Sequence, residues 1–258
     1  MKGVKALKFD VYGVTDTGCV RELNEDSYRI CGFKNGCEPG FCVVADGMGG
    51  HNAGEVASSL AVDFITNSLN DILHGNRTPD IPRRINDALN SANQSIYKLS
   101  KKDSSRLGMG TTSVICAFAD GEGYIANIGD SRAYACRNDE IYQITIDHSI
   151  VEEMVANGTI TKEEARFHPQ KNIITRALGS ESSTKADIFE YEYKPGDSIV
   201  MCSDGLSGMV DDKEILKTVQ SGKSSEYISK TLCSMAKSNG GFDNITVITI
   251  RIVEEETR

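Results

Sequence analysis

Short apolar segments that end at an aspartate are the most constraining feature of this sequence. Residues 41–45 form one such segment, which leads into Asp46, and residues 199–202 form another, which leads through a serine into Asp204. A short, continuous apolar run bounded by turn residues is typical of a buried strand. We therefore expect strands that deliver these carboxylates to one edge of a sheet, where like charges would repel strongly unless a cation lay between them.

Two further acidic motifs extend this pattern. Asp26, in a segment that begins at Arg21, is also expected at the end of a strand, whereas Asp243 is followed directly by Asn244. Hard divalent cations such as Mg²⁺ and Mn²⁺ prefer carboxylate oxygens, carbonyl oxygens and water as ligands. The sequence therefore predicts a metal centre of the kind that acts on phosphate.

Alternating apolar and polar segments predict a β-rich fold with helices outside it. The expected strands cover 8–15, 27–33, 41–45, 112–119, 122–128, 132–137, 141–145, 186–193, 198–202 and 245–253. Helical spacing occurs at 53–69, 80–100, 150–156, 212–220 and 225–237, and a capping-box pattern begins another helix at Thr161. The fold class predicted is α+β, with two packed, mainly antiparallel sheets flanked by helices on both sides, and residues 1–258 are predicted to form a single domain.

The polar stretch from 147 to 176 interrupts the strands and is predicted to be a flap beside the active site. Arg176 is expected to anchor the base of this flap, and His148 is expected to have a structural or substrate-facing role. Asp130 either binds metal or only makes a hairpin turn, and Arg132 is a candidate for its ion-pair partner.

Composition excludes several classes of function. The formal net charge is −9 and no lysine or arginine run is present, which argues against a nucleic-acid surface. No apolar stretch reaches the roughly 20 residues that span a bilayer. The eight cysteines include no CxxC pair, and those at 42, 116 and 202 lie inside apolar runs, so we expect reduced, structural thiols in a cytoplasmic protein.

Seven motifs occur in the order found in one known family. They are Gly18-Cys19-Val20-Arg21-Glu22-Leu23-Asn24-Glu25-Asp26, Val44-Ala45-Asp46-Gly47-Met48-Gly49-Gly50, Gly108-Met109-Gly110-Thr111-Thr112, Ile128-Gly129-Asp130-Ser131-Arg132, Ile173-Ile174-Thr175-Arg176-Ala177-Leu178-Gly179, Cys202-Ser203-Asp204-Gly205-Leu206 and Asp243-Asn244-Ile245-Thr246-Val247. In these motifs the chain resembles the type 2C, metal-dependent serine/threonine protein phosphatases in their bacterial form. Each motif alone is weak, but seven in this order are highly specific.

The resemblance implies a set of metal ligands. Asp46 is similar to the aspartate that bridges two metal ions, and the carbonyl of Gly47 is similar to a ligand of the second ion. Asp204 and Asp243 resemble the ligands that complete the first ion. Asp130 resembles the aspartate that, with Asp204, can hold a weaker third ion.

The resemblance also implies roles around the ions. Glu25 and Asp26 are similar to the pair that holds metal-bound waters, and Arg21 is similar to the arginine that grips the substrate phosphate. Many eukaryotic members have a histidine where Met48 stands here. His51, a metal-bound water or solvent therefore remain alternative sources of the proton for the leaving group.

The predicted reaction is hydrolysis of phosphoserine and phosphothreonine on proteins, in opposition to a bacterial serine/threonine kinase. Two Mn²⁺ or Mg²⁺ ions that share a bridging water would generate hydroxide, which attacks phosphorus in line. The alternatives are an inactive binding module on the same fold, which would be expected to have lost metal carboxylates, and a regulatory switch with one dedicated phosphoprotein. An unrelated metal phosphoesterase would be expected to have histidine-rich ligands, and only four histidines are present.

Overall fold

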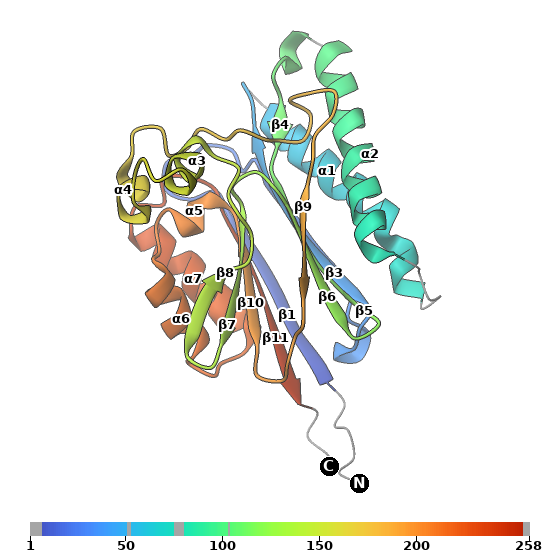
Figure 1. The fold of residues 1–258 in the computed structure, drawn as a ribbon, viewed down its shortest axis with the longest axis vertical. Coiled ribbons are helices and arrows are strands. Elements are labelled where there is room, and N and C mark those ends of the chain that lie inside the picture. The colour runs from blue at the N-terminus through green and yellow to red at the C-terminus, as the bar shows by residue number, and fades with distance from the viewer. Residues whose placement is uncertain (1–6, 51–52, 75–79, 103, 255–258) are drawn as a thin grey trace.

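Two antiparallel sheets packed face to face form the centre of the structure, a computed structural model that describes residues 7–50, 53–74, 80–102 and 104–254 (Figure 1). The first sheet has the strand order β1-β11-β10-β7-β8. The second has the order β2-β3-β5-β6-β9, and the short β4 pairs with β3. In chain order the strands are β1 Leu7–Asp16, β2 Asp26–Gly32, β3 Gly40–Met48, β4 Gly110–Thr111, β5 Ser113–Ala119, β6 Glu122–Ile128, β7 Arg132–Arg137, β8 Glu140–Gln143, β9 Asp187–Tyr191, β10 Ser198–Cys202 and β11 Ile245–Glu254.

Helices cover the outer face of each sheet, so the layers follow the order α-β-β-α (Figure 1). Helices α1 and α2 pack on the second sheet, and α5, α6 and α7 pack on the first. The helix bounds are α1 Ala53–Leu69, α2 Ile81–Lys102, α3 Ile150–Ala156, α4 Lys162–Phe167, α5 Asp204–Ser207, α6 Asp212–Val219 and α7 Ser225–Ser238. Short 3₁₀ helices cover Lys34–Gly36, Asn70–His74 and Ser104–Arg106. The predicted class of fold is confirmed.

Successive side chains of a central strand point alternately into the core between the two sheets and toward the helices outside. In β3, Cys42 and Val44 face the first sheet, whereas Val43 and Ala45 face the helical layer of α1 and α2. Because successive side chains of a strand point to opposite faces, a strand covered on both sides is apolar throughout. The continuous apolar run that leads into Asp46 therefore has a direct structural cause, and it fixes which edge of the sheet carries that carboxylate.

The predicted flap segment contains α3 and α4, which lie at one end of the sheets beyond β8 (Figure 1). Ser149 caps α3 by accepting a hydrogen bond from the backbone N–H of Glu152. Thr161 and Glu164 form the reciprocal capping box at the start of α4 that the sequence predicts. No helix among the described residues is long and apolar enough to cross a membrane.

Some local predictions are wrong. Asp26 does not end a strand but begins β2, and Asp46 does not follow its strand but lies inside β3, which continues to Met48. Strand β10 ends at Cys202 and leads to Asp204 as predicted, but Asp204 begins α5, a short helix that the sequence pattern does not predict. The run before Asp26 contains Arg21 and Asn24 and is not apolar, so it provides no strand of its own. The expected strand at 141–145 is also shorter and ends at Gln143.

Candidate metal centre

Strand pairing brings the first two carboxylates together. Asp26 and Asp46 are direct partners in the antiparallel register of β2 and β3. The backbone of Asp46 is held from the other side, because its N–H donates to Oγ1 of Thr112 over 2.9 Å and its carbonyl accepts from Oγ1 of Thr111 over 2.8 Å. These contacts fix the direction in which the Asp46 side chain leaves the strand.

Gly47 lies where two backbone segments approach closely. Its N–H donates to the carbonyl of Glu25 over 3.1 Å. A Cβ atom at this position would lie 2.1 Å from the carbonyl oxygen of Gly54 and 2.6 Å from that of Glu25. Only glycine allows α1 and the loop before β2 to approach β3 this closely.

We therefore expect Gly47→Ala to destabilise the protein by about 2 kcal/mol or more, because backbone atoms on both sides would have to move. The measurement is the midpoint of urea unfolding. Gly50→Ala in the same loop is the matched control, because a Cβ there meets nothing within 4 Å. Equal midpoints for the two variants would contradict this account of Gly47.

Asp26 is buried, and one of its carboxylate oxygens lies in a cage of hydroxyl groups. Oδ2 accepts hydrogen bonds from Ser203 over 2.7 Å and from Thr246 over 2.6 Å, while Oδ1 has no partner among the residues that the structure describes. Oε1 of Glu25 is likewise buried and has no partner in the described part of the chain. Buried carboxylate oxygens are normally hydrogen-bonded, so these two point to ligands such as water or a cation.

The loop before β11 is organised by Asn244. Its side-chain oxygen accepts from the backbone N–H of Glu25 over 2.7 Å, and its amide donates to the carbonyls of Thr17 over 3.0 Å and Leu23 over 2.9 Å. Asn244 thereby ties the Asp243 loop to the loop that carries Arg21 and Glu25. An asparagine suits this position because one side chain supplies both an acceptor and two donors.

Arg21 reaches the same place from the neighbouring loop. One of its guanidinium nitrogens lies 2.9 Å from Oδ2 of Asp243, and about half of the arginine side chain is exposed. The nearby carboxylate of Asp243 raises the pKa of Arg21, so the guanidinium is charged. A charged, half-exposed guanidinium beside a carboxylate cluster is suited to binding a phosphate group.

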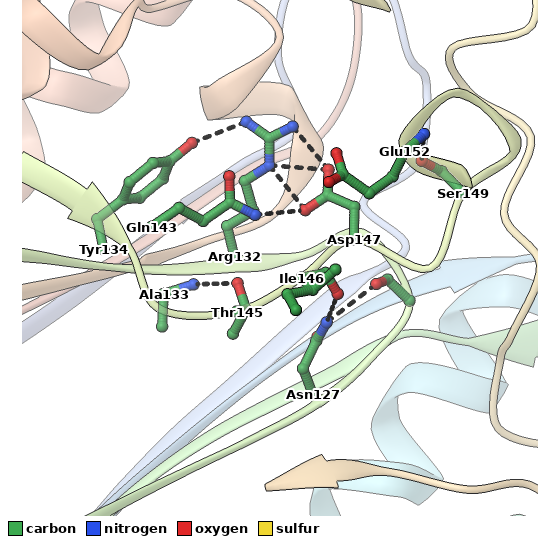
Figure 2. Close-up of polar contacts among 11 residues, drawn as sticks. Asn127, Arg132, Ala133, Tyr134, Gln143, Thr145, Ile146, Asp147, Ser149 and Glu152 are labelled. Atoms are coloured by element: carbon green, nitrogen blue, oxygen red, sulfur yellow. Dashed lines mark hydrogen bonds and ion pairs between the residues drawn. The ribbon is translucent and has the colours of Figure 1, made fainter. Parts of the chain in front are cut away.

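Asp130 precedes β7, and the prediction that Arg132 pairs with it is wrong. Figure 2 shows that Arg132 instead forks onto Asp147, with its Nη2 at 2.6 Å from Oδ2, and donates through Nη1 to the hydroxyl of Tyr134 over 2.8 Å. Gln143 donates a further hydrogen bond to Asp147. Because Arg132 binds Asp147 and Tyr134, it does not form the expected ion pair with Asp130. The carboxylate of Asp130 can therefore bind another ligand.

Like charges affect the ionisation of the whole cluster. Burial, followed by the charges of Asp26, Asp204, Asp130 and Asp243, raises the pKa of Asp46 well above its usual value. Burial and the neighbouring Asp243 raise the pKa of Asp204 to about 6, although a hydrogen bond with Asp46 lowers it. Burial and Asp204 raise the pKa of Asp130 to about 8. The five carboxylates therefore act on one another, as members of one site do.

This donor set fits divalent cations by its chemistry, since it offers carboxylate and carbonyl oxygens and no soft ligand. In the described part of the chain, however, no three Asp, Glu, His or Cys side chains are arranged to hold a metal ion as they stand. Asp243 is turned toward Arg21, and Oδ2 of Asp26 is bound to hydroxyls. Side-chain rotation would be needed for ligation, and the assignment of ligands stays a prediction.

A pocket of about 670 Å³ opens beside the cluster. Asp130 and Asp204 line this pocket together with residues of α3 and α4, among them Glu152 and Arg166. The predicted flap segment therefore borders the carboxylate cluster.

Arg176 and His148 lie at the base of that segment. Arg176 contacts Nε2 of His148 at 3.1 Å and a carboxylate oxygen of Asp187 at 3.3 Å. Nδ1 of His148 accepts from the backbone N–H of Gly129 over 3.1 Å, so a structural role fits this buried histidine. His51, the candidate proton donor, lies outside the described residues.

Sequence reasoning did not assign roles to the polar residues that support the cluster. These are Thr111, Thr112, Ser203, Asn244 and Thr246. All five stand inside the quoted motifs, but only Ser203 and Asn244 are adjacent to an aspartate in the sequence, so membership of a motif is the only signal that they share. A serine or threonine beside a turn is ordinarily a local hydrogen-bonding residue, so its long-range partner is revealed only by the fold.

The sequence of this chain is similar to those of known proteins. Residues 20–241 match the protein phosphatase 2C family. The chain belongs to this family. The protein phosphatase 2C relatives include the serine/threonine phosphatase Stp of Listeria innocua, 37% identical over 236 residues, which cover 92% of this chain and 93% of the relative. The protein phosphatase PhpP of Streptococcus pneumoniae is 36% identical over 243 residues, which cover 94% of this chain and 97% of the relative.

Solved structures of the family agree with the fold. The serine/threonine phosphatase PstP of Mycobacterium tuberculosis superimposes with a TM-score of 0.85 at 34% identity, covering 96% of this chain and all of that one. The catalytic domain of PstP has also been solved in complex with two manganese ions, and it superimposes with a TM-score of 0.83 at 33% identity over 96% of this chain and all of that one. The chain is thus a member of the metal-dependent serine/threonine protein phosphatases, as its motifs predict.

Proposed function

We propose that this protein removes phosphate from phosphoserine and phosphothreonine of proteins by direct hydrolysis, and that it opposes a serine/threonine kinase. The observation that carries the proposal is the cluster of mutually interacting carboxylates around Asp46, with the charged Arg21 at its edge. Two Mn²⁺ or Mg²⁺ ions in this cluster would supply a hydroxide near neutral pH and neutralise the phosphoryl oxygens. No covalent intermediate is required.

The residues of the chain take separate parts in this proposal. Asp46 and the carbonyl of Gly47, together with Asp204 and Asp243, would hold the two ions. This assignment is supported by the electrostatic coupling of the carboxylates and by the close approach that Gly47 permits. Asp130, whose carboxylate is not engaged by Arg132, would hold a third and weaker ion.

Glu25 and Asp26 would orient water at the edge of the site. Each has a buried oxygen that no described residue hydrogen-bonds, and the hydroxyls of Ser203 and Thr246 fix the other oxygen of Asp26. Arg21 would release Asp243 and receive the substrate phosphate through its planar fork of donors. That exchange would keep the phosphoryl group in position for in-line attack.

The test is hydrolysis after treatment with a chelator. Para-nitrophenyl phosphate and a phosphothreonine peptide are offered with Mn²⁺, Mg²⁺ or Ca²⁺ added back. We expect Mn²⁺ or Mg²⁺ to restore the hydrolysis of both substrates. A folded sample that stays inactive with every ion would contradict the proposal and favour a binding module on the same fold.

Compartment and domain organisation also belong to the proposal. All eight cysteines are free thiols, which suits a reducing compartment such as the cytoplasm. We take residues 1–258 as a single phosphatase domain with the flap at 147–176. The packing supports a single domain. Buried apolar residues lie between the two sheets, between the second sheet and α1 and α2, and between the first sheet and α5, α6 and α7.

The flap is proposed to act on substrate choice. We expect that exchanging residues 150–172 for the corresponding segment of a relative changes kcat/KM for phosphoproteins more than for para-nitrophenyl phosphate. The reason is that α3 and α4 line the same pocket as Asp204 but carry none of the proposed metal ligands. Equal losses with both kinds of substrate would mean that the segment supports the metal centre instead.

A further inference from the structure

Three exposed apolar residues lie close in sequence to Arg21 or to its ion-pair partner, Asp243. Val20 is 59% exposed and Leu23 is 44% exposed, and Phe242, directly before Asp243, is 61% exposed. Because Arg21 and Asp243 form an ion pair, the segments that carry these three residues meet at the phosphate-binding edge of the site. We name Val20, Leu23 and Phe242 the apolar platform.

The two loops beneath the platform are fastened to each other. The backbone N–H of Cys19 donates to the carbonyl of Gly241 over 2.7 Å. Gly18 packs so tightly that a Cβ there would lie 2.2 Å from the carbonyl oxygen of Asp243. Val20 and Phe242 therefore leave neighbouring stretches of backbone, one residue beyond this contact.

The backbone of Leu23 is also held by a hydrogen bond to the loop that contains Asp243. The side-chain amide of Asn244 donates to the Leu23 carbonyl over 2.9 Å, and Asn244 also accepts from the N–H of Glu25. The platform is therefore held by the same hydrogen bonds that position Glu25 and the Asp243 loop. A rigid support means that little conformational entropy is lost when a partner binds to these side chains.

Exposed apolar groups that gather at one place mark an interaction surface more often than isolated ones do. The position of these apolar residues beside Arg21 limits which kinds of molecule could bind them. A molecule whose phosphate binds Arg21 can place neighbouring atoms against this platform, because its three residues lie within two positions of Arg21 or of Asp243, the ion-pair partner of Arg21. A phosphoprotein segment satisfies this condition when an apolar side chain lies next to the phosphorylated residue.

We propose that the apolar platform binds an aliphatic or aromatic side chain close in sequence to the phosphoserine or phosphothreonine of the substrate. The platform thereby makes the enzyme prefer phosphorylated segments with an apolar neighbour. This inference rests on the proposed function only in taking Arg21 as the phosphate-binding residue.

The test compares phosphothreonine peptides that differ at one position, occupied by either leucine or serine, from two residues before to two residues after the phosphothreonine. Dissociation constants are measured by fluorescence anisotropy, and kcat/KM is measured with Mn²⁺. For at least one position we expect leucine to improve both quantities about tenfold, since burying one large apolar side chain has an effect of this order.

The double variant Leu23→Ser/Phe242→Ser removes most of the platform. We expect its leucine-to-serine ratio to fall to within about twofold of unity, because the apolar surface that leucine covers is gone. Tyr227→Ser is the matched control. Tyr227 is 50% exposed, but it lies at the opposite end of α7 from the loop that carries Phe242, so its ratio should equal that of the unmodified protein.

Several results would overturn the inference. One is a leucine-to-serine ratio near unity at every position, and another is a ratio that survives in the double variant. A double variant that keeps the ratio but changes the oligomeric state in size-exclusion chromatography would assign the platform to contacts between copies of the chain.

A different result would separate this inference from the proposed function. If leucine improves binding but neither the peptides nor para-nitrophenyl phosphate are hydrolysed with any ion, the platform is supported and the proposed function is contradicted.

Discussion

Asp46→Asn should reduce phosphatase activity with Mn²⁺ by roughly a thousandfold or more, because the amide removes one charged oxygen from the proposed bridging position between two ions. The measurement is kcat/KM for para-nitrophenyl phosphate over a series of Mn²⁺ concentrations. Asp120→Asn is the matched control. Asp120 lies in the left-handed region, at a φ of 55°, which asparagine also tolerates, so its kcat/KM should not change.

The same substitution should leave the chelated protein at least as stable as before. Burial and four neighbouring carboxylates raise the pKa of Asp46, which means that its charge is unfavourable in the fold when no cation is present. Asparagine removes that charge while keeping the size of the side chain. Loss of activity together with a clear fall in the melting temperature of the chelated Asp46→Asn protein would indicate a folding defect and contradict this reasoning.

The second large effect concerns pH and metal together. Burial raises the pKa of Asp26 to about 7, that of Asp204 to about 6 and that of Asp130 to about 8. A carboxyl group whose pKa is raised by folding stabilises the fold fully below its unfolded pKa, near 4. That contribution is lost as pH rises through the folded value. The stability of the chelated protein should therefore decline between about pH 4 and pH 8.

Melting temperatures measured across this range, with a chelator and with saturating Mn²⁺, provide the check. We expect a decline of at least about 4 °C in the chelated protein. Bound Mn²⁺ should reverse it, because a cation that binds only the folded state stabilises that state and favours ionised ligands. A chelated protein that becomes more stable up to pH 8, with no further gain from Mn²⁺, would show that these carboxylates do not form a cation site.

Much of the fold could be predicted because its strands are covered on both sides. Apolar runs such as 41–45 and 198–202 are required wherever a sheet has another layer on each face, and helical spacing at 53–69 marks the face that covers one sheet. The helix α1 has the predicted bounds, and the capping box at Thr161 is present. Both features depend on residues that lie close together in the chain, so the sequence pattern was enough to predict them.

The short elements near the site were harder to predict. Helix α5 has four residues and begins at Asp204, and β4 has two residues. Neither is long enough to show a periodic pattern, and both are stabilised by neighbours distant in sequence. Thr111 of β4, for example, donates to the carbonyl of Asp46, 65 residues away.

The sequence by itself identified the family and the layered fold, because seven ordered motifs retain the residue types that the family shares. The acidic residues of the proposed metal site stay a prediction of the same motifs. Tertiary structure alone decided that Asp26 lies opposite Asp46 on the neighbouring strand and that Arg132 forms an ion pair with Asp147. It also decided that the two loops with exposed apolar residues next to Arg21 and Asp243 meet at the ion pair of these two residues. The physical reason is that strand register and loop contacts depend on partners far apart in the chain, which no local pattern specifies.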